Sequence, residues 1–296
     1  MNLSGVWVAV VSFFNEDFSL DLPAFKNHCQ WLVDSGVDGL VPCGTTGEGP
    51  TLSSSERAQL VEAALSVTST HPNKKVIVGC GSNNTATTQI LLNQAAEMGA
   101  HAGLVVTPYY NKPTQAGLLA HYRTLADHSK IPIVLYNVPS RTGVNLAPET
   151  VHTLWQHPNI IGLKEATGNH SQWLSLTSPS IPSGKFLLAG DDDAYATLTA
   201  LGASGIISAS ANVAPELFVR LHQHLSQENW AEAFKLQKQL MGLIQSFFSE
   251  TNPGPIKYAL SRLKKGKNRL RLPLVSVAPE TEHKIAAQLK IWELIP

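Results

Sequence analysis

Lys164 stands at the end of an apolar run, Ile-Ile-Gly-Leu, whose composition and Gly-containing flank are typical of a buried strand. A strand interior seldom holds an ammonium group, because taking that charge out of water costs several kcal/mol unless it is paired or neutralised. Burial lowers the pKa of a lysine, and the free amine can then attack a carbonyl carbon to form a Schiff base. The alternative is an ordinary lysine that reaches water or pairs with Glu165, and for a lysine considered alone this alternative is the commoner one.

The alternation of side chains along a strand decides which neighbours this lysine meets. Gly162 shares a face with Lys164, and its missing side chain is expected to leave room beneath the amine. Glu165 points to the opposite face, so it is poorly placed to neutralise the lysine inside a barrel. The pattern therefore favours a reactive amine over a salt bridge.

A tyrosine and an arginine follow the preceding apolar run, which reads Ile-Val-Leu-Tyr-Asn and leads into Ser-Arg-Thr-Gly. If Val134 faces a barrel interior, Tyr136 does so as well, next to the lysine strand. Arg141 lies on the loop, where a guanidinium group could hold a substrate carboxylate through two parallel hydrogen bonds. A loop arginine is more often a solvated surface charge, and that alternative stays open.

Residues 44–49 read Gly-Thr-Thr-Gly-Glu-Gly and follow another apolar run. Such a turn presents backbone N–H groups and the hydroxyls of Thr45 and Thr46 to an anion, close to a helix that begins near Ser53. The turn lacks the Lys-Ser/Thr ending of a P-loop, so a carboxylate is a better ligand than a nucleotide. The alternative is a plain turn in which a threonine caps the helix.

Two further loops carry polar side chains. Tyr109 and Tyr110 are adjacent in a loop bounded by prolines, where tyrosines more often pack or form a subunit contact than take part in catalysis. A subunit contact and a proton-relay role are compatible. Residues 191–193 are three consecutive aspartates, which would repel a phosphate group, so the substrate is expected not to be phosphorylated. Adjacent residues diverge and make a poor metal site, so we expect no metal and interpret the aspartates as helix caps.

These residues must be positioned by a repeating fold. Apolar β-branched runs alternate with segments of helical spacing, which is the signature of parallel βαβ units. Strands are predicted over residues 5–13, 37–43, 75–81, 102–107, 132–138, 160–164, 185–190 and 205–209. Helices between them include residues 22–35, 53–70, 85–98, 116–128, 147–156 and 215–225. Eight strands favour the α/β class in the form of a (β/α)8 TIM barrel over an open doubly wound sheet.

The last part of the chain is predicted to be helical and without strands, over residues 229–248, 255–265 and 280–289. We therefore expect a barrel over residues 1–225 and a C-terminal helical appendage over residues 226–296, packed on the barrel. In such barrels the chemistry lies at the carboxyl ends of the strands, and the candidate residues described above fall there.

The composition excludes several classes of protein. The chain of 296 residues has a formal net charge of zero and no basic block, which argues against nucleic acid or an anionic membrane as a partner. No apolar stretch near the start is long enough to span a bilayer or has the pattern of a signal peptide. The three cysteines are widely spaced and form no metal-binding pair. We expect a cytoplasmic protein.

Together the candidate residues suit a small keto acid as the substrate. The threonine turn would grip its carboxylate, and Lys164 would attack its ketone. The proton transfers of imine formation and use could pass through the hydroxyl groups of Tyr136, Thr46 and Tyr110. No external cofactor is needed for this chemistry.

Four segments also carry a resemblance to a known family: residues 44–48, 136–143, 162–168 and 252–257. Over nearly the whole chain and in the same order, they resemble the 4-hydroxy-tetrahydrodipicolinate synthase (dihydrodipicolinate synthase) family, within the pyruvate-dependent class I aldolases. The resemblance implies a lyase that condenses pyruvate with aspartate semialdehyde on the diaminopimelate route to lysine. It also implies a homotetramer built from two tight dimers.

The resemblance assigns roles to individual residues. The catalytic residues that it implies are Lys164, which forms the Schiff base with pyruvate, and a proton relay of Thr46, Tyr136 and Tyr110. Tyr110 would come from the neighbouring subunit. The substrate-binding residues that it implies are Thr45, Thr46, Arg141, Gly190 and Ile207. Of these, Thr45 would hold the carboxylate of pyruvate and Arg141 that of aspartate semialdehyde, while the last two would line the pocket.

One departure from the family concerns its effector. Members that lysine inhibits use histidine and glutamate side chains in an allosteric cleft, and the matching positions here are Ser54, Arg57 and Thr87. Asn83 and Tyr109 are kept. Losing a carboxylate partner for the ammonium group of the effector should weaken binding by about 1.5–3 kcal/mol, so weak or absent inhibition by lysine is predicted.

Two other functions compete with this one. Another pyruvate-dependent lyase, such as N-acetylneuraminate lyase or a keto-deoxy-sugar aldolase, would share the lysine and the tyrosine. The turn over residues 140–143 suits a short acidic aldehyde better than a polyol. An inactive barrel that serves as a binding or regulatory protein would have a damaged relay, and every expected relay residue is present.

Overall fold

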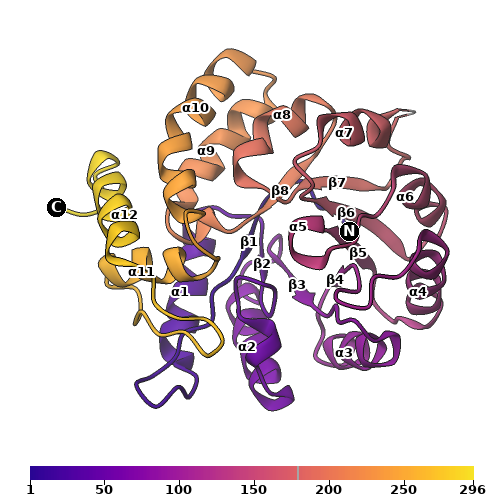
Figure 1. The fold of residues 1–296 in the computed structure, drawn as a ribbon, viewed down its shortest axis with the longest axis horizontal. Coiled ribbons are helices and arrows are strands. Elements are labelled where there is room, and N and C mark those ends of the chain that lie inside the picture. Colours follow the sequence, from indigo (N-terminus) through magenta and orange to yellow (C-terminus); the bar gives the residue numbers. More distant parts are fainter. Residues whose placement is uncertain (179) are drawn as a thin grey trace.

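The computed structural model describes residues 1–178 and 180–296, and its centre is a closed barrel of parallel strands (Figure 1). Each strand pairs with the next along the chain, and β8 pairs with β1 to close the barrel. The strands are β1 (Gly5–Ala9), β2 (Gly39–Val41), β3 (Lys75–Gly79), β4 (Ala102–Val106), β5 (Ile133–Asn137), β6 (Ile160–Glu165), β7 (Phe186–Ala189) and β8 (Gly205–Ser208). The predicted (β/α)8 barrel is confirmed.

Helices cover the outside of this barrel (Figure 1). The longer ones are α1 (Leu22–Asp34), α2 (Ser54–Thr68), α3 (Thr85–Glu97), α4 (Gln115–His128), α6 (Pro148–Trp155), α7 (His170–Thr177) and α9 (Pro215–Ser226). Two shorter ones are α5 (Pro139–Thr142) and α8 (Tyr195–Ala200). The local sequence sets where several of these helices begin. At each of these helix starts the N-cap side chain accepts a hydrogen bond from a backbone N–H of the first turn, and the N-cap residues are Asp21, Ser53, Asn84, Thr114 and Asn169. No described helix is both long and apolar enough to cross a membrane.

Alternating side chains divide the core into two layers. Inward-facing residues fill the barrel, and this inner cluster includes Trp7, Ile77, Val134 and Ile207. The larger layer lies between the strands and the outer helices. Tyr136 belongs to the inner cluster with Val134 and is 8% exposed, so the predicted shared face of the two residues is confirmed, and that face is the interior.

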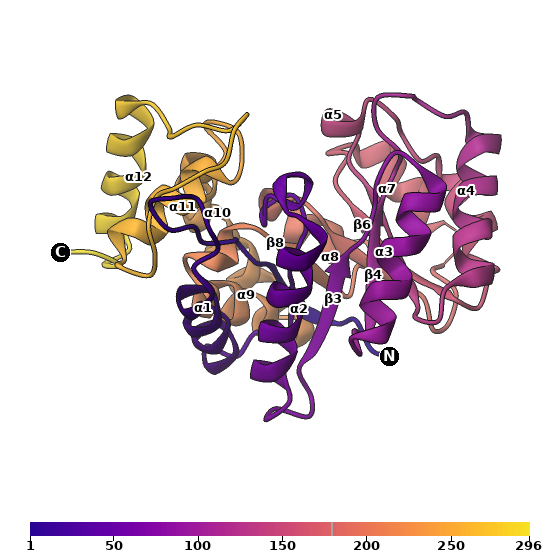
Figure 2. The same ribbon diagram turned by 90° about the horizontal axis from the view of Figure 1, so that it is seen from below.

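Three helices form the C-terminal region: α10 (Trp230–Phe247), α11 (Gly254–Arg262) and α12 (Pro279–Ile291). Helix α10 packs against α8 and α9, and α11 contacts the 3₁₀ turn η3 (Ser210–Asn212) that follows β8. In both views α12 lies at the edge of the molecule, on the side away from α4 (Figure 2). The predicted helical appendage is confirmed, whereas the division of the chain at residue 225 stays a prediction.

Candidate active site

Lys164 and Tyr136 lie side by side on neighbouring strands. They are partners in the register of β5 and β6, so the sheet itself places them together. Lys164 is only 6% exposed, and its Nζ atom lies 4.3 Å from the centre of the Tyr136 ring. A cation over the negative face of an aromatic ring is attracted to it, and this contact holds the amine against the phenol side chain.

The space next to Gly162 is filled, contrary to the prediction. A Cβ atom at this position would lie 3.0 Å from Cδ1 of Leu3 and 3.0 Å from the carbonyl oxygen of Phe186. The glycine therefore permits a close approach of neighbouring atoms rather than leaving room. The prediction was wrong because Leu3 comes from the segment before β1, far away in the sequence.

Glu165 is turned away from the lysine, as predicted. Its two carboxylate oxygens accept hydrogen bonds from Asn137 Nδ2 at 3.1 Å and from the Thr167 N–H at 2.9 Å. The side chain is buried, and burial raises the pKa of this carboxyl group against the opposing effect of those hydrogen bonds. These contacts occupy Glu165 on the face opposite Lys164.

The threonine turn follows β2 and is tied to the C-terminal region. Thr46 is 2% exposed, and its hydroxyl accepts a hydrogen bond from Asn252 Nδ2 at 2.9 Å. Neither Thr45 nor Thr46 caps the next helix, because Ser53 does so in a reciprocal capping box with Glu56. The alternative interpretation of the turn as a helix cap is therefore wrong.

A cavity of about 460 Å³, a volume that suits a small ligand, opens beside Tyr136 and the threonine turn. Neither Lys164 nor Thr46 is among the residues that line it. Thr45, Tyr136 and Arg141 line it together, although they come from three separate parts of the barrel mouth. Leu104 and Val106 supply part of an apolar wall. Arg141, on α5, is exposed to solvent and lines this cavity, so its guanidinium group is available to a charged ligand there.

Gly190 directly follows β7, and Ile207 lies on β8. The Gly190 N–H donates to the carbonyl oxygen of Glu165 at 2.7 Å, and a Cβ atom here would lie 2.7 Å from Cβ of Ala166. Ile207 is fully buried in the inner cluster that also contains Tyr136. Both residues pack close to the site, and their contact with substrate stays a prediction.

The aspartates at 191–193 do not cap a helix, so that prediction was wrong. Asp191 makes no capping hydrogen bond, and α8 begins after Ala194. Asp192 is buried, and one of its oxygens accepts from the Ser210 N–H at 2.8 Å and the Ser210 hydroxyl at 2.6 Å. Burial raises the pKa of Asp191 to about 6, the neighbouring Asp193 adds to this, and the charge of Lys164 opposes it. Among the described residues, no group of three or more metal-binding side chains is placed to hold a metal ion.

The two adjacent tyrosines have different surroundings. Tyr109 lines the cavity, whereas Tyr110 is 88% exposed and has a backbone φ of 73°. A positive φ is unusual for a residue with a bulky side chain. Within one chain the structure therefore does not bring Tyr110 to Lys164, and its predicted role requires a second subunit.

Two of the three positions that match the effector cleft lie at the same cavity. Ser54 and Arg57 line it, and the Arg57 guanidinium donates to the carbonyl oxygen of Gly79. Thr87 lies in the first turn of α3, where its N–H donates to Asn84 Oδ1 at 2.9 Å. Arg57 therefore contributes a positive charge where lysine-inhibited members are expected to have histidine or glutamate side chains. Weak inhibition by lysine stays a prediction.

Sequence reasoning assigned no role to Glu48, which belongs to the turn, or to Asn252 and Lys257, which contact it. Lys257 and Glu48 are wholly buried, and their Nζ and Oε1 atoms lie 2.6 Å apart. A signal was available, because Lys257 stands among apolar residues of a short helix that starts at Gly254. A lysine in such a place needs a buried partner, but nothing near it in the sequence names that partner.

A (β/α)8 barrel with a buried lysine next to a tyrosine at the ends of adjacent strands has the construction of an aldolase-type enzyme that works through a Schiff base. The model of the Dihydrodipicolinate synthetase family matches residues 2–292. The chain belongs to this family, and the resemblance seen in the sequence is confirmed.

Relatives and solved structures agree with this assignment. The 4-hydroxy-tetrahydrodipicolinate synthase of Thermodesulfovibrio yellowstonii is 41% identical over 296 residues, which cover 98% of this chain and 99% of the relative. The dihydrodipicolinate synthase structure from Thermotoga maritima has a TM-score of 0.96 at 38% identity and covers 99% of both chains. The Acinetobacter baumannii enzyme, solved in complex with pyruvate, has a TM-score of 0.96 at 34% identity and covers 99% of this chain and 100% of its own.

Proposed function

We propose that this chain condenses pyruvate with L-aspartate 4-semialdehyde to give 4-hydroxy-tetrahydrodipicolinate, on the route to diaminopimelate and lysine. The observation that carries the proposal is Lys164, buried at the end of β6 with its amine 4.3 Å from the centre of the Tyr136 ring. The name shared by the relatives supports the same reaction.

The proposed reaction forms and then uses an imine. The Lys164 amine attacks the ketone carbon of pyruvate, and loss of water leaves a protonated Schiff base. Its positive charge acidifies the methyl group, so removal of a proton there gives an enamine. The enamine carbon attacks the aldehyde of the second substrate and forms the new carbon–carbon bond. The amino group of that substrate then attacks the imine carbon, which closes the ring and releases Lys164.

The proton transfers are assigned to hydroxyl groups. Tyr136 lies against the lysine, with its ring centre 4.3 Å from Nζ, and Thr46 is buried in the threonine turn. Tyr110, from a second subunit, would connect this relay to solvent. Each group can both donate and accept a proton, which a step that runs through a carbinolamine requires.

The two carboxylates are assigned to separate walls of the cavity. Thr45 and the backbone of its turn would hold the carboxylate of pyruvate, and Gly190 and Ile207 would line the pocket around it. Arg141 would hold the carboxylate of aspartate semialdehyde, because a guanidinium fork matches a carboxylate through two hydrogen bonds. The same residue argues against N-acetylneuraminate lyase and keto-deoxy-sugar aldolases, whose second substrates are polyols.

We further propose a homotetramer built from two tight dimers, working in the cytoplasm. The exposed ring and positive φ of Tyr110 support a subunit contact that covers it. Three free, buried cysteines support a reducing compartment. Sedimentation analysis tests the assembly, and a fully active monomer would contradict the role of Tyr110.

The deciding experiment measures turnover of aspartate semialdehyde with pyruvate, coupled to a reductase that oxidises NADPH. The wild type should be active and Lys164→Ala inactive. Borohydride with pyruvate should add mass to Lys164 of the wild type. An adduct without turnover would show that the aldehyde is wrong, and the absence of any adduct would overturn the Schiff-base mechanism.

A further inference from the structure

A wholly buried ion pair connects the C-terminal region to the threonine turn. Nζ of Lys257, on α11, lies 2.6 Å from Oε1 of Glu48, and neither side chain is exposed. The other carboxylate oxygen of Glu48 accepts a hydrogen bond from the backbone N–H of Arg271 at 2.9 Å. These contacts join residues that are 209 and 223 positions apart in the sequence.

Glu48 has an unusual backbone conformation. Its φ is 52°, in the left-handed region that residues other than glycine seldom adopt. Its N–H donates to the carbonyl oxygen of Thr45 at 3.1 Å, and its own carbonyl oxygen accepts from the Thr51 N–H at 2.9 Å. Such a conformation persists where surrounding contacts hold it in place, and both carboxylate oxygens of Glu48 are held by the C-terminal region.

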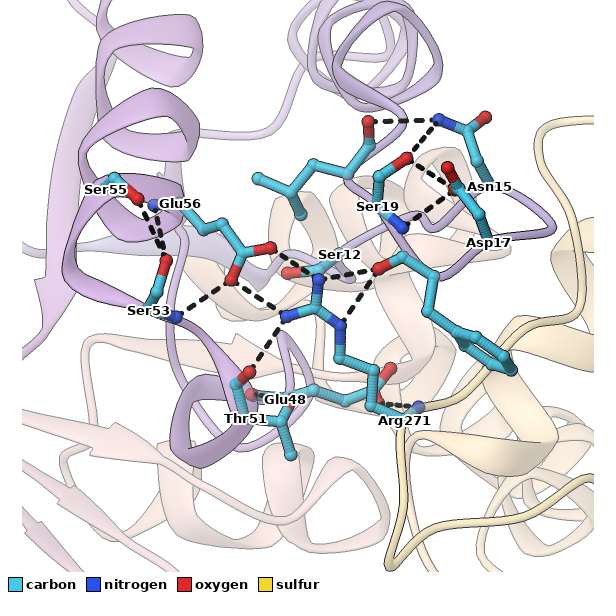
Figure 3. A network of polar contacts seen from close by, with 12 residues as sticks. Ser12, Asn15, Asp17, Ser19, Glu48, Thr51, Ser53, Ser55, Glu56 and Arg271 are labelled. Atoms are coloured by element: carbon cyan, nitrogen blue, oxygen red, sulfur yellow. Dashed lines mark hydrogen bonds and ion pairs between the residues drawn. The ribbon is translucent and has the colours of Figure 1, made fainter.

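Arg271 fixes the same region from outside. Its guanidinium group donates to the carbonyl oxygens of Phe18 at 2.6 Å and Thr51 at 2.9 Å, and to Oε2 of Glu56 at 2.9 Å. Figure 3 shows this group between the loop after β1 and the start of α2. The segment after α11 therefore clamps the elements on both sides of the turn.

The ion pair is expected to fix the conformation of the turn more than to stabilise the fold. Desolvation of two charges offsets much of their attraction, so a buried pair is weak evidence for a gain in stability. It does select one arrangement, because any other leaves a buried charge without a partner. In the arrangement observed here, Thr45 lines the cavity and the Thr46 hydroxyl accepts a hydrogen bond from Asn252.

We propose that Lys257 and Arg271 are positioning residues that hold Thr45 and Thr46 in the geometry that grips the pyruvate carboxylate and relays protons. Lys257 acts through its ion pair with Glu48, and Arg271 acts through its backbone N–H on Glu48 and its guanidinium group on Thr51 and Glu56. This inference rests on the function proposed above. The C-terminal helices are then a working part of the active site and not only a cover on the barrel.

The test compares Lys257→Met with the double variant Glu48→Gln/Lys257→Met. The single variant leaves Glu48 buried without its partner, so both its melting temperature and its kcat/KM for pyruvate should fall. A displacement of the turn by about 1 Å is expected to lower kcat/KM by about tenfold to a hundredfold. The double variant removes both charges at similar volume, so the melting temperature should recover while kcat/KM stays low.

Lys265→Met is the matched control. Lys265 follows the same helix, and its Nζ atom lies 4.0 Å from the centre of the Trp31 ring, at a different place from the turn. Its loss should leave kcat and KM unchanged. If Lys257→Met does not fold, the double variant and Arg271→Gln carry the test through the same two measurements.

Recovery of kcat/KM together with the melting temperature, or full activity in the single variant, would overturn the inference, because the pair would then be only structural. Borohydride trapping separates this result from failure of the proposed function. The absence of a pyruvate adduct on wild-type Lys164 would contradict the proposed function itself. An adduct that forms equally fast in the wild type and the variants would contradict only the positioning role of Lys257 and Arg271.

Discussion

The Nζ atom of Lys164 lies 4.3 Å from the centre of the Tyr136 ring, and the two residues are partners on adjacent strands. The register of a parallel sheet therefore sets this relationship, whereas the groups expected to meet the substrate carboxylates lie on the threonine turn and on the short helix α5. The Lys164 amine and its aromatic neighbour are thus positioned by strands, which hold side chains more precisely than loops do.

Tyr136→Phe should lower kcat by about a hundredfold or more, because a positioned acid–base group contributes roughly 10²–10⁴ in rate. The ring remains, so the contact with the lysine amine and the fold should persist. Steady-state kinetics and a melting curve measure the two effects. Tyr122→Phe is the matched control, since it removes another buried hydroxyl that donates to the Val105 carbonyl oxygen at 3.2 Å, in the barrel wall. Equal losses of kcat in the two variants would contradict the relay.

Arg141→Gln should raise KM for aspartate semialdehyde and leave KM for pyruvate nearly unchanged. A hydrogen-bonded charge pair of this kind contributes about 1.5–3 kcal/mol, which corresponds to about tenfold to a hundredfold in affinity. Arg123→Gln, an exposed arginine on α4, is the control. A parallel rise of KM for both substrates would instead place Arg141 at the pyruvate carboxylate.

Lysine should inhibit weakly or not at all. Arg57 lines the cavity at a position that the resemblance assigns to the effector cleft, and its positive charge would repel the ammonium group of the effector. Initial rates across a lysine titration measure this directly. Half-inhibition at sub-millimolar lysine would refute the prediction, and Arg57→Glu should strengthen inhibition if this position decides it.

Acid should destabilise the fold through two buried histidines. Burial lowers the pKa of His28 and of His121 to about 4, from an ordinary value of 6.5. The unfolded chain then binds more protons than the folded one between these values, so stability is fully present above pH 6.5 and is lost as the pH falls toward 4. A shift of this size corresponds to about 3 kcal/mol for a fully buried group such as His28.

The measurement is urea unfolding of the wild type and His28→Gln at several pH values across that window. The variant should show a shallower loss of stability, because one of the two titrating groups is gone. His283→Gln, at an exposed site on α12, should follow the wild type. An unchanged slope in His28→Gln would contradict the assignment.

Much of the barrel was predictable because its signals are local. Strand runs, helical spacing and polar caps such as Ser53 act within a few residues, so eight strands and most outer helices were predicted near their observed positions. Alternation along a single strand also predicted that Tyr136 faces the same way as Val134, whereas the structure decided that this face is the interior. The errors arose where the answer lay elsewhere in the chain, as with Leu3 against Gly162 and Ser210 against Asp192.

The sequence by itself determined the fold class, the lysine and its neighbouring tyrosine, because strand periodicity is a short-range property. Only the tertiary structure decided that the C-terminal region holds the threonine turn, through Lys257 and Arg271 on Glu48. A buried charge reveals that it needs a partner, but the choice of partner depends on which distant segments pack together. That choice is made by burial of the whole core, and no local pattern encodes it.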